Sequence, residues 1–143
     1  MHMLWSLAVA AVSLAAPVAS TAQDVRRTVA IVYSDVCTHA DTGDLLGDRV
    51  VVLRFFEGDY VFFQTAQGAI QEPLLGTATI DYKNNDIVFK VSASDKSVAT
   101  FKGKMDGKVL TGKFDNHWTN RSGGELLRLS RIDAGQRDVP ECR

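Results

Sequence analysis

The segment from Asp35 to Asp48 holds the densest group of side chains that could do chemistry. It combines His39 with four aspartates. A histidine beside carboxylates can act as an acid or base or bind a metal. However, the calcium-loop pattern is absent, and a zinc site needs three or four converging ligands. We therefore expect a solvated connection in which Gly43 and Gly47 allow tight turns.

A second unusual segment runs from His117 to Gly124. A histidine, a tryptophan and an arginine follow one another closely there. Trp118 could stand at the rim of a ligand site, or it could plug one end of the fold. The sequence alone leaves both alternatives open.

Sequence motifs of common enzymes are missing from the chain. It contains no Gly-x-Ser-x-Gly nucleophile, no His-Glu-x-x-His zinc motif and no glycine-rich phosphate loop. The glutamates Glu57, Glu72 and Glu125 lie near expected turns or strand ends, where solvation is usual. We therefore expect a protein that is not an enzyme and that has no metal or cofactor.

The N-terminus has the pattern of a secretory signal peptide. Met1–Ala22 contains no Asp, Glu, Lys or Arg, and its apolar stretch from Leu4 to Ala16 ends at Pro17 and small residues. That stretch is shorter than the roughly 20 apolar residues that span a bilayer. We expect cleavage at its end, export to the periplasm or the exterior, and a single mature domain over residues 23–143 without a membrane span.

Export gives a meaning to the two cysteines. Cys37 and Cys142 are the only cysteines of the chain and lie near opposite ends of the mature domain. In an oxidising compartment such a pair indicates a disulfide. The bridge would close a loop of about one hundred residues, which chain-entropy estimates value at roughly 4–5 kcal/mol.

Charge and size limit the function classes further. Lys and Arg number 16 and Asp and Glu number 17, which gives a formal net charge of −1. A general nucleic-acid binder needs a basic footprint, so we expect no nucleic-acid partner. The length of 143 residues leaves room for one domain, and a hydrophobic content of 45% is ordinary for a globular one.

Apolar residues of the mature chain recur with a period of two, between turn signals spaced roughly 8–12 residues apart. This pattern predicts an all-β fold with neighbouring strands antiparallel. We expect a single eight-stranded up-and-down barrel, with a β-sandwich as the alternative. The expected strands are Thr28–Tyr33, Val50–Phe56, Tyr60–Thr65, Leu74–Tyr82, Ile87–Ser92, Val98–Met105, Lys108–Phe114 and Glu125–Ile132.

One hairpin can be predicted from its own turn. The single Asp-Gly pair of the chain suits a two-residue type I′ turn. That turn pairs Gly103 with Leu110 and Phe101 with Gly112. One face of the hairpin is then apolar and the other largely polar, so the turn and the hydrophobic pattern agree.

Two further hairpins follow from an Asn-Asn turn and a Gly-Asp turn. The first pairs Ile80 with Phe89, again on an apolar face. The second pairs Phe55 with Phe62, but both faces of Val50–Phe63 are apolar. This ribbon is therefore either buried on both sides or in contact with something outside the barrel.

A signal peptide, eight short antiparallel strands and a disulfide near the ends of the chain resemble the small exported β-barrels of the lipocalin and avidin type. The likeness is one of architecture, because the lipocalin Gly-x-Trp signature and a biotin-site pattern are absent. Residues 37–47, Cys-Thr-His-Ala-Asp-Thr-Gly-Asp-Leu-Leu-Gly, also resemble exported bacterial proteins of unknown function. These resemblances imply a location and a barrel, and no activity.

Our leading hypothesis is that the barrel binds a small apolar or amphipathic molecule in its interior. Tyr60, Gln64 and Tyr82 have polar tips on the expected inner faces and would orient the ligand, with Trp118 at the rim. The residues expected to line the interior are Leu53, Phe55, Phe62, Ile80, Phe89, Phe101, Leu110, Phe114, Leu127 and Leu129.

The alternative is a protein–protein interaction module, such as a periplasmic inhibitor of a cell-wall hydrolase. The contact surface would then be the doubly apolar ribbon, Val50–Phe63. An exposed aromatic patch on that ribbon would favour a protein partner. An empty cavity inside the barrel would favour a small ligand.

Overall fold

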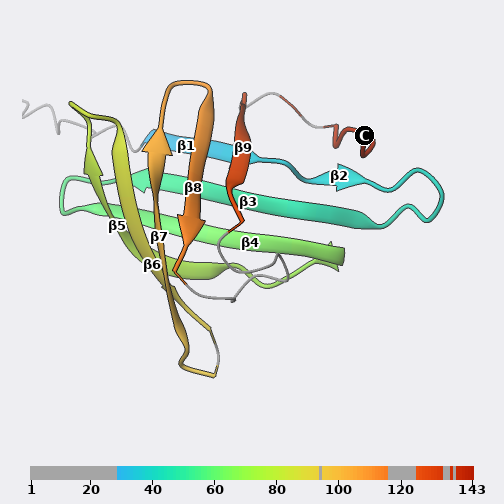
Figure 1. Ribbon diagram of the computed structural model, residues 1–143, viewed down its shortest axis with the longest axis horizontal. Coiled ribbons are helices and arrows are strands. Elements are labelled where there is room, and N and C mark those ends of the chain that lie inside the picture. Colours follow the sequence, from blue (N-terminus) through green and yellow to red (C-terminus); the bar gives the residue numbers. More distant parts are fainter. Residues whose placement is uncertain (1–28, 94, 116–124, 134–135, 137) are drawn as a thin grey trace, which may run out of the picture.

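The computed structural model describes residues 29–93, 95–115, 125–133, 136 and 138–143. Within these ranges the chain forms nine strands and no helix (Figure 1). The strands are β1 (Val29–Ser34), β2 (Cys37–Thr38), β3 (Leu45–Arg54), β4 (Asp59–Ile70), β5 (Leu74–Asp81), β6 (Asp86–Ser92), β7 (Val98–Met105), β8 (Val109–Phe114) and β9 (Leu127–Ile132). The expected signal peptide and the residues His117 and Trp118 lie outside the described residues.

The strands close into a barrel. β1 pairs with β9 on one side and with β3 on the other, and each intervening strand pairs antiparallel with its neighbour. β2 continues the line of β1 along β3, because Ser34 pairs with Arg49 and Cys37 pairs with Leu46 in one register. The predicted eight-stranded antiparallel barrel is confirmed, with β2 as an extra strand, and the β-sandwich alternative is excluded.

β3 and β4 are the longest strands, with ten and twelve residues. Residues 45–48 pair with residues 65–68, and this part of the ribbon runs beyond the barrel beside β2 (Figure 1). β5 pairs with β4 only as far as Phe63. The start of β3 was predicted at Val50, which is five residues later than its observed start at Leu45.

The Asp-Gly hairpin has a register that differs from the prediction by two residues. Gly103 pairs with Gly112, and Phe101 pairs with Phe114. The carboxylate of Asp106 accepts hydrogen bonds from the backbone N–H groups of Lys108 and Val109, at 2.7 and 2.6 Å. Because this aspartate shapes the turn through its side chain, the backbone does not adopt the positive φ angles of a type I′ turn. A shift by two residues keeps each side chain on its predicted face.

The other two hairpins shift in the same way. Ile80 pairs with Ile87, two residues from the prediction, because Asp81 accepts backbone hydrogen bonds in a four-residue loop. In the Gly-Asp hairpin Leu53 pairs with Tyr60, four residues from the prediction. Both shifts are even, so the predicted faces of these strands relative to each other survive.

β3 and β4 nevertheless turn the opposite face inward from the one predicted. The buried core residues of these strands are Val50, Val52, Val61 and Phe63. Val50 pairs with Tyr33 of β1, which is itself 1% exposed, so closure against β1 selects this face. The prediction that Leu53, Phe55 and Phe62 line the interior was therefore wrong.

The remaining seven residues predicted for the interior lie in the core or pack against it. They are Ile80, Phe89, Phe101, Leu110, Phe114, Leu127 and Leu129. Tyr33 joins them from β1, and its hydroxyl donates a hydrogen bond of 2.8 Å to the carbonyl of Asp106. Within the hydrophobic cluster, the hydroxyl of Tyr33 is the group that reaches out to the β7–β8 turn.

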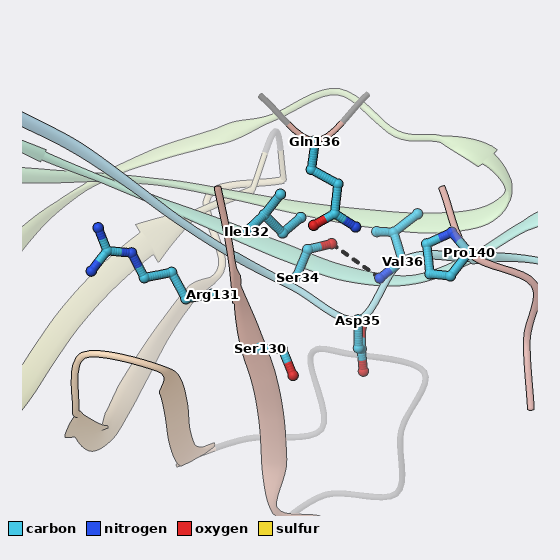
Figure 2. A pocket seen from close by; sticks show the side chains of 8 residues that line it. All are labelled: Ser34, Asp35, Val36, Ser130, Arg131, Ile132, Gln136 and Pro140. Carbon is cyan, nitrogen blue, oxygen red and sulfur yellow. Dashed lines mark hydrogen bonds between the residues drawn. The ribbon is translucent and has the colours of Figure 1, made fainter. Parts of the chain in front are cut away.

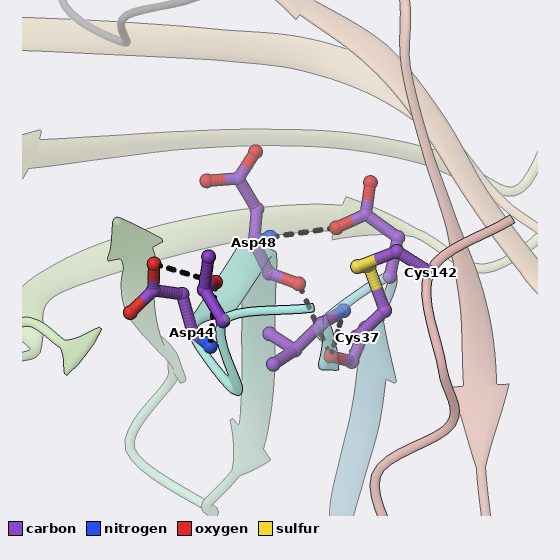
Figure 3. The surroundings of a disulfide bond; sticks show 8 residues. Cys37, Asp44, Asp48 and Cys142 are labelled. Atoms are coloured by element: carbon purple, nitrogen blue, oxygen red, sulfur yellow. Dashed lines mark hydrogen bonds between the residues drawn. A yellow bond between two sulfur atoms is a disulfide. The ribbon is translucent and has the colours of Figure 1, made fainter. Parts of the chain in front are cut away.

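The C-terminal tail lies along β2. Cys37 and Cys142 form the predicted disulfide, with their Cα atoms 4.9 Å apart (Figure 3). The backbone N–H of Thr38 donates to the carbonyl of Pro140 at 2.8 Å, and that of Cys142 donates to the carbonyl of Thr38 at 2.9 Å. The tail therefore covers one edge of the ribbon that leaves the barrel.

Candidate functional site

Two of the residues predicted to hold a ligand lie outside the barrel. Tyr60 and Gln64 alternate along β4 with the buried residues Val61 and Phe63, so their side chains point away from the interior. The ring of Tyr60 meets the ring of Phe55 edge to face, with centroids 5.7 Å apart. The prediction that Tyr60 and Gln64 face the interior was therefore wrong, because β3 and β4 turn their other face inward.

Tyr82 lies in the turn after β5, at one end of the barrel, and is 46% exposed. Its hydroxyl donates to a carboxylate oxygen of Asp59 at 3.1 Å, and the guanidinium of Arg54 lies 4.0 Å from its ring centroid. Arg54 and Asp59 are cross-strand partners and form an ion pair at 4.0 Å. Burial raises the pKa of Tyr82, and the hydrogen bond to Asp59 raises it further.

Tyr82, Arg54 and Asp59 thus contact one another at this end of the barrel. The structure does not bring Tyr82 together with Tyr60 and Gln64 in one site, and Trp118 lies outside the described residues. Sequence reasoning missed the Arg54–Asp59 pair. The signal that could have found it is the opposite charge of two residues that flank one hairpin turn.

Aromatic rings fill the middle of the barrel. Phe63, Phe89, Phe101 and Phe114 come from four different strands. Phe89 and Phe101 stack with centroids 4.6 Å apart, and Phe114 meets the other three rings at 5.0 to 5.8 Å. Rings at these distances are in direct contact, so this part of the interior is occupied by the protein itself.

The outer side of β3, β4 and β5 is apolar. We call it the outer apolar face, and it consists of Leu53, Tyr60, Phe62 and Leu75 on these strands and of Phe55 directly after β3. Cross-strand pairing places Leu53 beside Tyr60 and Phe62 beside Leu75. Leu75 is 57% exposed and Phe55 is 43% exposed. Leu53, Tyr60 and Phe62 are partly buried beside them. Exposed apolar surface that gathers in one patch marks interaction sites on soluble proteins.

The Asp35–Asp48 segment is the expected solvated connection only in its middle, where residues 40–44 are exposed and the hydroxyl of Thr42 donates to the carboxylate of Asp44 at 2.8 Å. Asp48 is 2% exposed, and its carboxylate accepts a hydrogen bond of 3.0 Å from the hydroxyl of Thr65. Its backbone N–H donates to the carboxylate of Asp35 at 2.6 Å, and its carbonyl accepts from the hydroxyl of Ser34. Gly47 has φ +115° and leaves room for Asp35. These groups brace the junction of β1, β2 and β3.

His39 begins the turn that leads into β3. Its backbone N–H donates to the carbonyl of Asp44, and Gly43, with φ +74°, closes the turn onto His39 as expected. Among the described residues no group of three or more His, Cys, Asp or Glu side chains is placed to hold a metal ion. The segment therefore has a structural role that its polar composition concealed.

A pocket of about 220 Å³ lies between β1, β9 and the C-terminal tail. Its lining includes Ser34, Asp35, Arg131 and Gln136 (Figure 2). The side chains of Arg131 and Asp35 point away from each other in Figure 2, and the hydroxyl of Ser34 accepts a hydrogen bond from the backbone of Val36. The polar groups do not converge on one point, as a ligand site requires.

No protein-family model, curated protein or solved structure matches the chain. No enzyme family is therefore assigned to it. Within the described ranges no helix is long and apolar enough to cross a membrane. The outer apolar face is the surface that most needs a functional explanation.

Proposed function

We propose that the protein is an exported binding module that recognises a protein partner through its outer apolar face. The observation that carries this proposal is the exposure of Leu75 and Phe55 beside the rings of Tyr60 and Phe62. Aromatic residues are enriched at the centres of protein interfaces, where they contribute most of the binding energy. A barrel closes without apolar side chains on its outside, so the fold alone does not account for a cluster of them there.

The geometry of the face also suits a protein surface. Four of its five residues lie on three neighbouring paired strands, which hold their backbone in a fixed arrangement, and Phe55 directly follows β3. A rigid apolar surface loses little conformational entropy on binding. Arg54, with its guanidinium half-exposed beside the face, adds a group that is frequent in interfaces.

The small-ligand hypothesis has less support. Four contacting phenylalanine rings fill the middle of the barrel. Two of the four residues proposed to orient a ligand point outward, and a third is held by Arg54 and Asp59. A small molecule inside the barrel would have to displace core side chains.

Export is part of the proposal. A disulfide between Cys37 and Cys142 is compatible with an oxidising compartment outside the cytosol. Intact-mass measurement of protein recovered from the exported fraction tests this. A mature chain beginning near Gln23 is expected, and retention of Met1–Ala22 would contradict export by a cleaved signal peptide.

The binding proposal is tested by site-specific photo-crosslinking in the native host. A photoreactive residue replaces Leu75 on the outer apolar face or, as the matched control, Val88, which is an exposed apolar residue on β6. We expect one discrete crosslinked protein from the first position and none from the second. Native mass spectrometry of the purified protein reveals whether a small molecule is bound instead.

The captured protein is then purified and its affinity for the barrel is measured. Phe55→Ser and Leu75→Ser are expected to weaken binding at least about ten-fold, as for residues at the centre of an interface. Val88→Ser should leave binding unchanged. Equal losses at all three positions, or a retained small molecule without a protein partner, would overturn the proposal. Inhibition of a cell-wall hydrolase stays a prediction until that partner is identified.

A further inference from the structure

The outer side of the other half of the barrel is basic. We call it the basic face, and it consists of Lys90 on β6, Lys102 and Lys104 on β7, Lys113 on β8 and Arg128 on β9. All five are exposed and alternate with core residues along their strands. The whole chain has a formal net charge of −1, so this concentration of cations is not a result of composition.

Strand pairing brings these cations close together. Lys102 lies directly opposite Lys113, and Thr111 lies between Lys104 on one side and Arg128 on the other. Directly opposite residues have Cβ atoms about 4.5–5.5 Å apart. The hydroxyl of Thr111 therefore lies within a ring of positive side chains that come from three strands.

Few acidic groups neutralise the basic face. Among the described residues only Lys104 has an ion pair within it, at 2.7 Å from Asp86. Asp115 lies near Lys102, but its carboxylate accepts the backbone N–H of Thr100 at 2.9 Å, and this bond is the main cause of its lowered pKa. Like charges directly opposite on neighbouring strands destabilise a sheet. The face therefore carries a cost in stability that an anionic ligand would offset.

We propose that the basic face binds a linear acidic polysaccharide. The cations span four of the eight strands, so they follow the curved wall of the barrel. A flexible polymer can follow that curvature, whereas a flat bilayer meets only part of it. One pyranose residue has about the length of a cross-strand step, and the hydroxyl of Thr111 can bond a sugar hydroxyl between the charged groups.

The composition of the face disfavours other polyanions and protein partners. The outward residues of β6 to β9 include lysines, threonines, serines and valines, and no aromatic ring occurs among those that the structure describes. Single-stranded nucleic acids are bound largely by stacking on aromatic rings. Lysine is depleted at the centres of protein interfaces. A lysine-rich face without rings fits a polymer recognised by its charge.

This inference does not depend on the proposed function. The basic face lies on β6–β9, and the outer apolar face lies on β3–β5. Figure 1 shows β7, β8 and β9 running across the direction of β3 and β4. One molecule could therefore hold a protein partner and an acidic polymer at the same time.

Isothermal titration with polygalacturonate at 50 mM NaCl tests the inference on the full mature chain. We expect saturable binding that weakens by roughly ten-fold or more at 200 mM NaCl, because several cations contribute together. The double variant Lys102→Glu/Lys113→Glu should bind more than about thirty-fold more weakly, because each basic residue beside an anionic surface contributes about 1 kcal/mol and the glutamates add repulsion. Lys102→Gln/Lys113→Gln removes the charge without reversing it and should show a smaller loss.

The control is Lys83→Glu/Lys96→Glu, which changes the net charge equally at two turns outside the basic face. It should bind like the wild type, and melting temperatures establish that all variants are folded. No binding at 50 mM NaCl, an equal loss in the control, or equal binding of uncharged dextran would overturn the inference. Tighter, lysine-dependent binding to phosphatidylglycerol vesicles would overturn it in favour of a membrane surface.

Discussion

The two halves of the barrel wall differ in what they present to the outside. On β6 to β9 apolar side chains point inward, and the outward positions are mostly lysines, threonines and serines. On β3 to β5 the inward side is equally apolar, but the outward side carries Leu53, Phe62 and Leu75 as well, and Phe55 follows directly after β3. Both halves close the same barrel, so folding requires only the inward pattern.

Each outward surface therefore carries a cost that the fold does not demand. The outer apolar face leaves Leu75 and Phe55 in water. The basic face sets Lys102 against Lys113. Because the two costs have different chemistry, they point to different partners. Substitutions that separate the inner and outer sides of each half test this comparison.

The largest effect is expected where the inner and outer sides of β4 are compared. Phe63→Ala should lower the free energy of unfolding by about 3–5 kcal/mol, because it removes a buried ring that contacts Phe114 at 5.0 Å. Phe62→Ala, on the next residue and the opposite face, should cost at most about 1 kcal/mol. Urea denaturation measures both. A larger cost at Phe62 would mean that the interior is assigned to the wrong face.

The second prediction makes the same comparison on β8. A Cβ atom at Gly112 would lie against the ring of Phe101 and 2.5 Å from the carbonyl of Lys102. Gly112→Val should therefore cost about 1–3 kcal/mol through overpacking. Thr111→Val, on the outer side, should change stability by at most about 0.5 kcal/mol. Equal shifts in melting temperature would contradict the separation of the two sides.

The Gly112 prediction also indicates how much of the fold the sequence contains. Local signals, period two and turn residues, were enough to predict the barrel, most strand positions and the face of every strand from β5 to β9. The register was not local, because Asp81 and Asp106 widen their turns through side-chain hydrogen bonds. The predicted contact between the ring of Phe101 and Gly112 is nevertheless present. Phe101 reaches Gly112 from a diagonal position, because its direct cross-strand partner is Phe114.

The inward face of β3 and β4 could not be predicted from the ribbon itself, because both of its sides are apolar. The choice is made by closure, which pairs Val50 with Tyr33 and Val52 with Ile31 on β1. The burial of Asp48 is non-local too, since its partner Thr65 lies 17 residues away. The candidate ligand residues Tyr60 and Gln64 were predicted on the wrong face because the pairing of β3 with β1 could not be foreseen.

The third prediction concerns pH and the inner tyrosine. Burial is the main cause of the raised pKa of Tyr33, so the folded state favours its neutral form. The stabilisation from this preference is fully present below the ordinary tyrosine pKa of about 10 and is lost as the pH rises through the higher folded-state value.

Tyr33→Phe should cost about 1 kcal/mol at pH 7, because the hydrogen bond to the carbonyl of Asp106 is lost. The variant should then lose less stability than the wild type as the pH rises above about 10. Urea denaturation across this range checks both effects. Parallel pH profiles for the two proteins would show that Tyr33 does not titrate with unfolding.

The smallest expected effect bears most directly on the basic face. Lys113→Thr removes one member of the pair with Lys102, so it should raise the free energy of unfolding by about 0.3 kcal/mol at low salt. The gain should vanish in 1 M NaCl, where the screening length is only about 3 Å. Lys90→Thr is the control, because Lys90 lies between Thr77 and Thr100 and not opposite a cation. Threonine is placed on a strand in both variants, so differences in strand propensity cancel.

Equal changes at both positions would show that Lys102 and Lys113 do not repel each other, and the cost ascribed to the basic face would disappear. A variant that is more stable but binds polygalacturonate more weakly would separate the two roles, because the lysine would then serve binding at the expense of the fold.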